Sequence, residues 1–153
     1  SFILNSDIIY VGGGNTKSML AVFKAWGIDH LLRQANQQGT VLAGVSAGMI
    51  CWYEQGITDS YQDKMDILPC LSMIRGCACP HYDSEGDRQP LVHQLIKDNI
   101  IEACIAVEDG AAVHYKDHKH HQSIAFQPHK NAYTVKLVDG SITEEKHIMS
   151  SLT

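Results

Sequence analysis

The sequence predicts an α/β fold with a mainly parallel sheet and an antiparallel extension at its C-terminal end. Two observations lead to this prediction. Strand and helix patterns alternate in the first two thirds of the chain, which is typical of parallel strands with crossover helices. In the last third, short alternating runs are separated by polar turns, which is typical of hairpins.

The first half of the chain contains two strand patterns, each followed by a glycine-rich turn and a helix pattern. The apolar run 8–11 ends at Gly12-Gly13-Gly14, and Asn15 is placed to cap the next helix. Apolar residues at helical spacing continue to Gly39, with a break expected at Gly27. The run 41–44 predicts a second strand, and a helix is expected over 47–55.

The second half begins with a stretch, 56–69, that we expect to be irregular. The pattern then predicts strands at 72–79 and 105–107, a helix at 89–98, and antiparallel strands at 111–115, 123–126 and 133–138. We find no repeat or linker, so residues 1–153 are expected to form one domain.

The composition and net charge of the chain indicate which kinds of molecule it binds. The 153 residues are 44% hydrophobic and 19% charged, with a formal net charge of −5, which gives no basic surface for nucleic acid. A peptide or small molecule is the expected partner. No apolar run reaches the 18 or so residues of a membrane span, so no membrane partner is expected. Five cysteines without the spacing of a secreted framework predict free thiols and a cytoplasmic location.

The pentapeptide Gly44-Val45-Ser46-Ala47-Gly48 has the G-x-S-x-G spacing of a nucleophile elbow. Such a turn lifts a serine out of the sheet, and its small neighbours let the strand and the helix approach each other. The alternative is a glycine-rich turn whose serine merely caps a helix. The strand before the motif and the helix after it favour Ser46 as a nucleophile.

A serine nucleophile needs a histidine base within hydrogen-bond reach. Among nine histidines, His81 follows a predicted strand directly, and functional groups gather at the carboxyl ends of parallel strands. The other histidines lie on helices, on strands or in the polar segment 116–121, where solvated or packed side chains are the simpler interpretation. We therefore predict His81 as the base.

The acid that orients the histidine has two candidates. Glu108 ends the apolar strand 105–107 in the same way that His81 ends its own strand, and it is the preferred choice. Asp59 lies between the nucleophile and the histidine and is the alternative acid, although a solvated carboxylate explains it equally well.

Backbone N–H groups of Gly13, Gly14 and Ala47 are the predicted donors for an oxyanion. A glycine-rich turn also suits phosphate, but its spacing matches neither G-x-G-x-x-G nor a P-loop, so we expect no cofactor. Cys77 and Cys79 share one strand face and are interpreted as reduced core thiols rather than metal ligands. The histidines between 118 and 121 are interpreted as solvent-exposed, so no metal site is predicted.

Four segments together resemble peptidase family S51, the group of dipeptidase E and cyanophycinase. They are 11–16 with Gly-Gly-Gly-Asn, 44–48, Pro80-His81-Tyr82 and Glu108-Asp109-Gly110. The resemblance implies a three-layer fold similar to class I glutamine amidotransferases, with a Ser-His-Glu triad on Ser46, His81 and Glu108. It also implies that the glycine loop with Asn15 contacts substrate.

In the dipeptidase E branch, an arginine after the histidine is linked to recognition of an N-terminal aspartate, and Arg88 is the matching candidate here. Family members usually carry further strands and helices before the Val11 loop. The chain thus resembles a shortened member, and an incomplete sheet and self-association are expected.

The sequence therefore predicts a serine peptidase that hydrolyses small peptides through an acyl-enzyme, with Asp-X dipeptides among the candidate substrates. The alternatives are a cyanophycinase-like enzyme, an esterase or another acyl hydrolase with the same triad, and a catalytically silent domain whose glycine loop binds a small ligand.

Overall fold

The computed structural model describes residues 1–152, which form a mixed α/β fold with few helices. The helical elements are η1 (Ile3–Asn5), α1 (Thr16–Ala25), α2 (Ile28–Gln37), α3 (Ala47–Ile50) and α4 (Arg88–Lys97). The strands are β1 (Ile8–Val11), β2 (Val41–Gly44), β3 (Tyr53–Tyr61), β4 (Lys64–Pro69), β5 (Ile74–Cys79), β6 (Ala103–Val107), β7 (Ala111–Lys116), β8 (Lys119–Ala125), β9 (Ala132–Val138), β10 (Ser141–Lys146) and β11 (Met149–Ser151).

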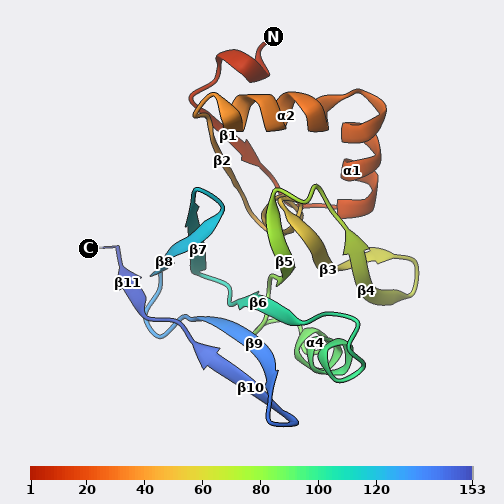
Figure 1. The fold of residues 1–153 in the computed structure, drawn as a ribbon, viewed down its shortest axis with the longest axis vertical. Coiled ribbons are helices and arrows are strands. Elements are labelled where there is room, and N and C mark those ends of the chain that lie inside the picture. Colours follow the sequence, from red (N-terminus) through yellow and green to blue (C-terminus); the bar gives the residue numbers. More distant parts are fainter. Residues whose placement is uncertain (153) are drawn as a thin grey trace.

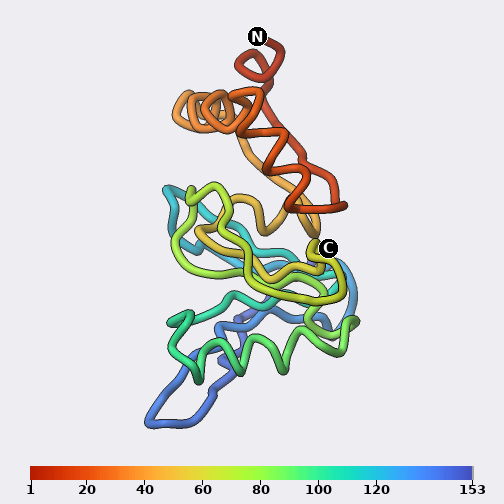
Figure 2. The backbone as a smooth tube through the Cα atoms, turned by 90° about the vertical axis from the view of Figure 1, so that its right-hand side faces the viewer, coloured from red at the N-terminus to blue at the C-terminus, as the bar shows by residue number. Residues whose placement is uncertain are grey.

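The strands form three sheets of different sizes. The strand orders are β1-β2, β10-β9-β6-β5-β3-β4 and β11-β8-β7. The β1-β2 unit and its helices lie at one end of an elongated molecule, and β9, β10 and α4 lie at the other (Figure 1, Figure 2). The segments that follow β2, β5 and β6 meet between these ends, which is where the candidate active site lies.

The N-terminal unit packs its parallel strands against α1 and α2. Asn15 caps α1 by accepting a hydrogen bond from the Ser18 N–H, as expected from the sequence. Gly27 separates the two helices in a left-handed conformation with φ of 66°. Leu20 and Leu32 enter a core with side chains of β1 and β2. Several large apolar side chains of this unit remain exposed, among them Ile8, Tyr10, Val22, Trp26 and Val41.

The six-stranded sheet has a parallel centre and antiparallel edges. Strands β3, β5 and β6 pair in parallel, whereas β4, β9 and β10 join antiparallel. Helix α4 contacts β4, β9 and β10 and covers one face, where Val92, Leu95 and Ile96 are buried against Cys104 and Val135. The sheet aligns the carboxyl ends of β5 and β6 side by side, which brings the residues after them together.

The expectation of a mainly parallel sheet is only partly met. Parallel and antiparallel pairings are equally frequent among the described strands, and β1-β2 forms a separate sheet. The predicted helix over 47–55 is wrong beyond residue 50, and the segment 56–69, expected to be irregular, is the β3-β4 hairpin. Gly56 lies within β3, and the absence of a side chain lets the strand pack against α3, because a Cβ on this residue would lie 2.7 Å from the Ile50 Cβ.

The polar turn expected over 116–121 covers fewer residues than predicted. Asp117 and His118 have positive φ, and β8 begins at Lys119. His120 and His147 both hydrogen-bond the buried Ser123 hydroxyl, at 2.9 and 2.7 Å. These bonds join β8 to the segment before β11, while His118, His120 and His121 remain exposed, as expected from the sequence.

The cysteines agree with the prediction of free thiols. Within residues 1–152, all five are unpaired and buried. Burial raises the pKa of the Cys70 and Cys79 thiols to about 12 each. The helices of the described residues include none that is long and apolar enough to cross a membrane.

Candidate active site

Ser46 stands at a sharp turn between β2 and α3. Its backbone has φ of 55° and ψ of −115°, a conformation that L-residues rarely adopt. The turn is crowded: a Cβ on Gly44 would lie 2.2 Å from the Gly48 carbonyl oxygen, and one on Gly48 would lie 1.9 Å from the Val11 carbonyl oxygen. The two glycines therefore let β1, β2 and α3 approach closely enough to hold Ser46 in its strained position.

Replacing Gly48 tests this packing. We expect Gly48→Ala to lower the free energy of unfolding by about 3 kcal/mol or more, because the new methyl group meets backbone rather than a movable side chain. Urea denaturation gives the measurement. Gly86→Ala is the matched control, since nothing lies within 4 Å of the added Cβ. Equal midpoints for the two variants would contradict the proposed role of Gly48.

His81 reaches Ser46 from the end of β5. Its backbone has φ of 54°, so the chain turns sharply after Pro80 and directs the ring toward the elbow. The His81 Nε2 lies 2.9 Å from the Ser46 Oγ, and 24% of the histidine side chain is exposed. This is the contact that a general base needs with a serine nucleophile. The structure thus brings together the two residues that the sequence paired.

Asp109 completes the chain of hydrogen bonds on the far side of the ring. Its Oδ1 lies 2.6 Å from the His81 Nδ1, and its Oδ2 accepts a hydrogen bond of 2.6 Å from the Ser84 hydroxyl. The Ser84 hydroxyl, and then the His81 ring, lower the pKa of Asp109 below its ordinary value. The carboxylate is therefore ionised at neutral pH, where it favours the Nδ1–H tautomer of His81.

Glu108 faces away from His81, which corrects the expected placement of the acid. Its carboxylate accepts hydrogen bonds from the Asn131 N–H at 2.8 Å and from the Tyr133 hydroxyl at 2.8 Å. The Glu108 N–H itself continues the pairing toward β9 by bonding the Asn131 carbonyl. The strand ends before Glu108, and Asp109 lies in a turn in which the Ala111 N–H bonds the Glu108 carbonyl, so the two successive carboxylates have different partners. The acids predicted from the sequence were Glu108 and Asp59, and Asp109 was not among them, although it directly follows Glu108.

Two further sequence candidates lie elsewhere. Asp59 is an exposed residue in the second half of β3, and none of the hydrogen bonds found among residues 1–152 joins it to His81. Arg88 starts α4, and its side chain is only 3% exposed. Its guanidinium donates to the Ile57 carbonyl and pairs with Glu85. The expected substrate contact of Arg88 is therefore not supported, because its guanidinium is already bonded inside the protein.

The glycine loop lies directly beside the nucleophile. A Cβ on Gly13 would be 3.3 Å from the Ser46 Cβ, so the bare backbone of this residue packs against the serine. Gly14 has φ of 136°, and the Asn15 amide donates to the Ser60 carbonyl at 3.4 Å. Ala47 is buried at the start of α3. Glycine N–H groups next to a nucleophile suit an oxyanion, and the oxyanion role of Gly13, Gly14 and Ala47 stays a prediction.

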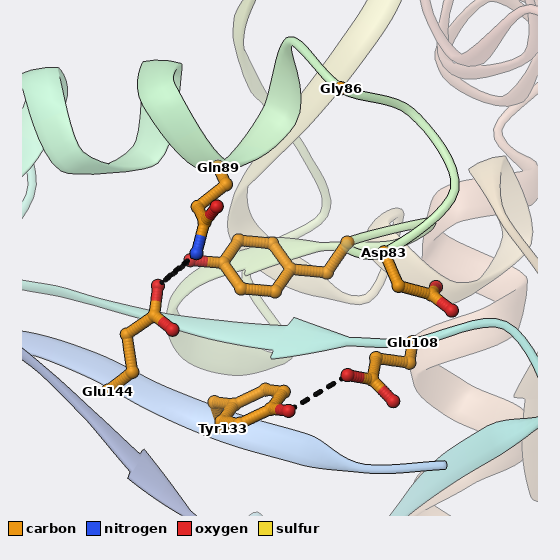
Figure 3. Close-up of a pocket in the computed structure, with 7 residues that line it drawn as sticks. Asp83, Gly86, Gln89, Glu108, Tyr133 and Glu144 are labelled. Atoms are coloured by element: carbon orange, nitrogen blue, oxygen red, sulfur yellow. Dashed lines mark hydrogen bonds between the residues drawn. The ribbon is translucent and has the colours of Figure 1, made fainter. Parts of the chain in front are cut away.

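A separate pocket of about 230 Å³ lies behind the turn that follows His81. Its lining residues are Tyr82, Asp83, Gly86, Gln89, Glu108, Tyr133 and Glu144. The Tyr82 hydroxyl donates to the Glu144 carboxylate, and Figure 3 shows the Tyr133 hydroxyl directed toward Glu108. Ser46 and His81 do not line this pocket, so it is not where a carbonyl would be attacked.

Comparisons with known proteins identify the family of this chain. The family model described as peptidase family S51 matches residues 1–123. The chain belongs to peptidase family S51. This confirms the resemblance seen in the sequence, and the match covers Ser46, His81 and Asp109 alike.

Two relatives are named as peptidases. The chain is 44% identical over 144 residues to the uncharacterized peptidase YgaJ of Bacillus subtilis (strain 168), covering 94% of this chain and 62% of that protein. It is 28% identical over 85 residues to the uncharacterized peptidase Lin0382 of Listeria innocua serovar 6a, covering 52% of this chain and 41% of the relative. The chain thus spans less than two thirds of the length of either relative.

Proposed function

We propose that this S51 chain carries the active site of a serine peptidase, with Ser46 as nucleophile, His81 as general base and Asp109 as the orienting acid. The observation that supports it is the continuous series of hydrogen bonds from the Ser46 Oγ through both ring nitrogens of His81 to the Asp109 carboxylate. A strained elbow holds the serine at one end of this series. The names of the relatives, both peptidases, support the same class.

The proposed reaction proceeds through an acyl-enzyme. His81 Nε2 takes the proton from the Ser46 Oγ as the oxygen attacks the peptide carbonyl, and the Ala47 and Gly13 N–H groups stabilise the resulting oxyanion. The protonated His81 then gives this proton to the leaving amine, and the C–N bond breaks. Water attacks the ester with His81 again acting as base, which releases the acid and restores Ser46.

Small peptides are the proposed substrate class, as in a dipeptidase E-like enzyme. Asp-X dipeptides remain candidates, but recognition of the aspartate by Arg88 is not part of the proposal, because its guanidinium is buried against Glu85 and Ile57. For the whole protein we propose the three-layer arrangement of class I glutamine amidotransferases and a cytoplasmic location. The unpaired cysteines among the described residues favour a reducing compartment.

A fluorophosphonate tests the proposal directly. It reacts with a serine that is activated by a neighbouring base, so we expect a single covalent adduct on the peptide that contains Ser46. Mass spectrometry of the digested protein identifies the labelled residue. Preincubation with a dipeptide that the protein hydrolyses should slow the labelling. An intact protein that takes up no label, or takes it up at another serine, would refute the assignment.

An esterase or a silent binding domain would give different results. An esterase with the same residues would be labelled and would cleave p-nitrophenyl acetate, yet would leave dipeptides with Asp, Asn, Gly or Leu at the first position intact. A silent binding domain would bind a small ligand without labelling. Turnover of a dipeptide together with the Ser46 adduct supports the peptidase.

A further inference from the structure

The turn 81–84 contains both residues that hydrogen-bond the Asp109 carboxylate, His81 and Ser84. The Asp109 Oδ1 meets the His81 ring and the Oδ2 meets the Ser84 hydroxyl, each at 2.6 Å. The Ser84 and Glu85 N–H groups both bond the His81 carbonyl, which folds this segment back on itself. The histidine and the serine are thereby held on the same side of Asp109, three residues apart.

The same turn is anchored to the end of β6 by its backbone and by Asp83. The Tyr82 N–H donates to the Val107 carbonyl at 3.1 Å, and the Asp109 N–H donates to the Asp83 Oδ1 at 2.9 Å. The other Asp83 oxygen pairs with Lys130. These contacts fix the backbone of Asp109, but they leave the rotation of its carboxylate undetermined.

Asp109 needs such a restraint because 49% of its side chain is exposed. An exposed carboxylate exchanges readily between protein and water partners, and a single bond to an imidazole leaves it free to rotate. A second, charge-assisted hydrogen bond to the other oxygen removes this freedom. The hydroxyl of Ser84 is the group that provides it.

We propose that Ser84 is a positioning residue that holds the Asp109 carboxylate in line with His81. The inference rests on the proposed function, because it assigns a role within the same active site. Ser84 does not contact the nucleophile and acts only through Asp109. Its loss should slow the chemical step and leave substrate binding largely unchanged.

The test compares Ser84→Ala, Ser84→Thr and the control Ser141→Ala, whose serine is exposed at the start of β10. With the best dipeptide of the panel, Ser84→Ala should lower kcat about tenfold with little change in KM, because a hydrogen bond to a charged group is lost. Ser84→Thr keeps the hydroxyl and should restore most of the rate. Ser141→Ala should match the wild type.

A double-mutant cycle separates positioning from a general structural effect. If Ser84 acts through Asp109, then Ser84→Ala should cause no further loss in an Asp109→Asn background. An equal tenfold loss in both backgrounds would overturn the proposal. So would full activity of Ser84→Ala.

A titration provides a readout that does not depend on activity. The pKa of Asp109, followed by the NMR signal of its carboxyl carbon, should rise toward the ordinary value in Ser84→Ala, because the hydroxyl that stabilises the ionised form is gone. An unchanged pKa would overturn the proposal. Failure of Ser46 to label would instead overturn the proposed function, and this titration would still report on the contact of Ser84.

Discussion

Ser46→Ala is expected to lower kcat/KM for the best dipeptide by about 10⁵-fold, because removing a nucleophile leaves only substrate binding and the oxyanion donors. His81→Ala should cause a loss of similar size, since the Ser46 hydroxyl is then left without its base at 2.9 Å. Purified proteins assayed by release of the free amino acid provide the measurement. Circular dichroism shows whether each variant remains folded.

The double variant distinguishes a coupled pair from two independent contributions. Residues that act as one unit are strongly non-additive, so the double variant should be no slower than Ser46→Ala alone. His121→Ala is the matched control, because this histidine is exposed on β8. Losses that multiply in the double variant, or a residual rate within tenfold of the wild type, would contradict a shared role of Ser46 and His81.

Sequence reasoning found the elbow and its histidine because both depend on local signals. Glycines on either side of Ser46 are needed where backbones approach to within contact, and this requirement is visible in the pentapeptide. The fold was predicted less completely. The β3-β4 hairpin lacks a glycine turn signal, since Asp63 takes the positive φ there. The helix pattern over 47–55 also hid the start of β3, because the helix itself ends at Ile50.

The third residue of the site could not be chosen from the sequence. Glu108 and Asp109 are adjacent acids after β6, and which one turns toward His81 depends on where the pairing with β9 ends. That pairing extends to Glu108 and directs its carboxylate to Tyr133 and Asn131. The burial of Arg88 could not be predicted from the sequence either, because its guanidinium bonds the carbonyl of Ile57, which is distant in sequence. Tertiary contacts decide both cases.

The identity of the acid leads to a second large effect. Asp109→Asn should lower kcat by about 10³-fold, because a neutral amide no longer favours the Nδ1–H tautomer of His81 or stabilises the imidazolium that forms during reaction. Glu108→Gln should change kcat by less than about threefold, since its carboxylate bonds Asn131 and Tyr133 rather than the histidine. Steady-state assays with one dipeptide compare the two variants.

The fluorophosphonate labelling rate provides an independent comparison of the same two variants. Activation of Ser46 depends on His81 in the correct tautomer, so labelling should slow strongly in Asp109→Asn and remain near the wild-type rate in Glu108→Gln. Thermal melting should rank the two variants the other way, with the lower melting temperature in Glu108→Gln. The three hydrogen bonds of Glu108 join the end of β6 to β9, whereas the Asp109 side chain is half exposed. Slow labelling of Glu108→Gln together with fast labelling of Asp109→Asn would support Glu108, the acid expected from the sequence. The chain after β6 would then have to rearrange when substrate binds, so that Glu108 rather than Asp109 faces His81.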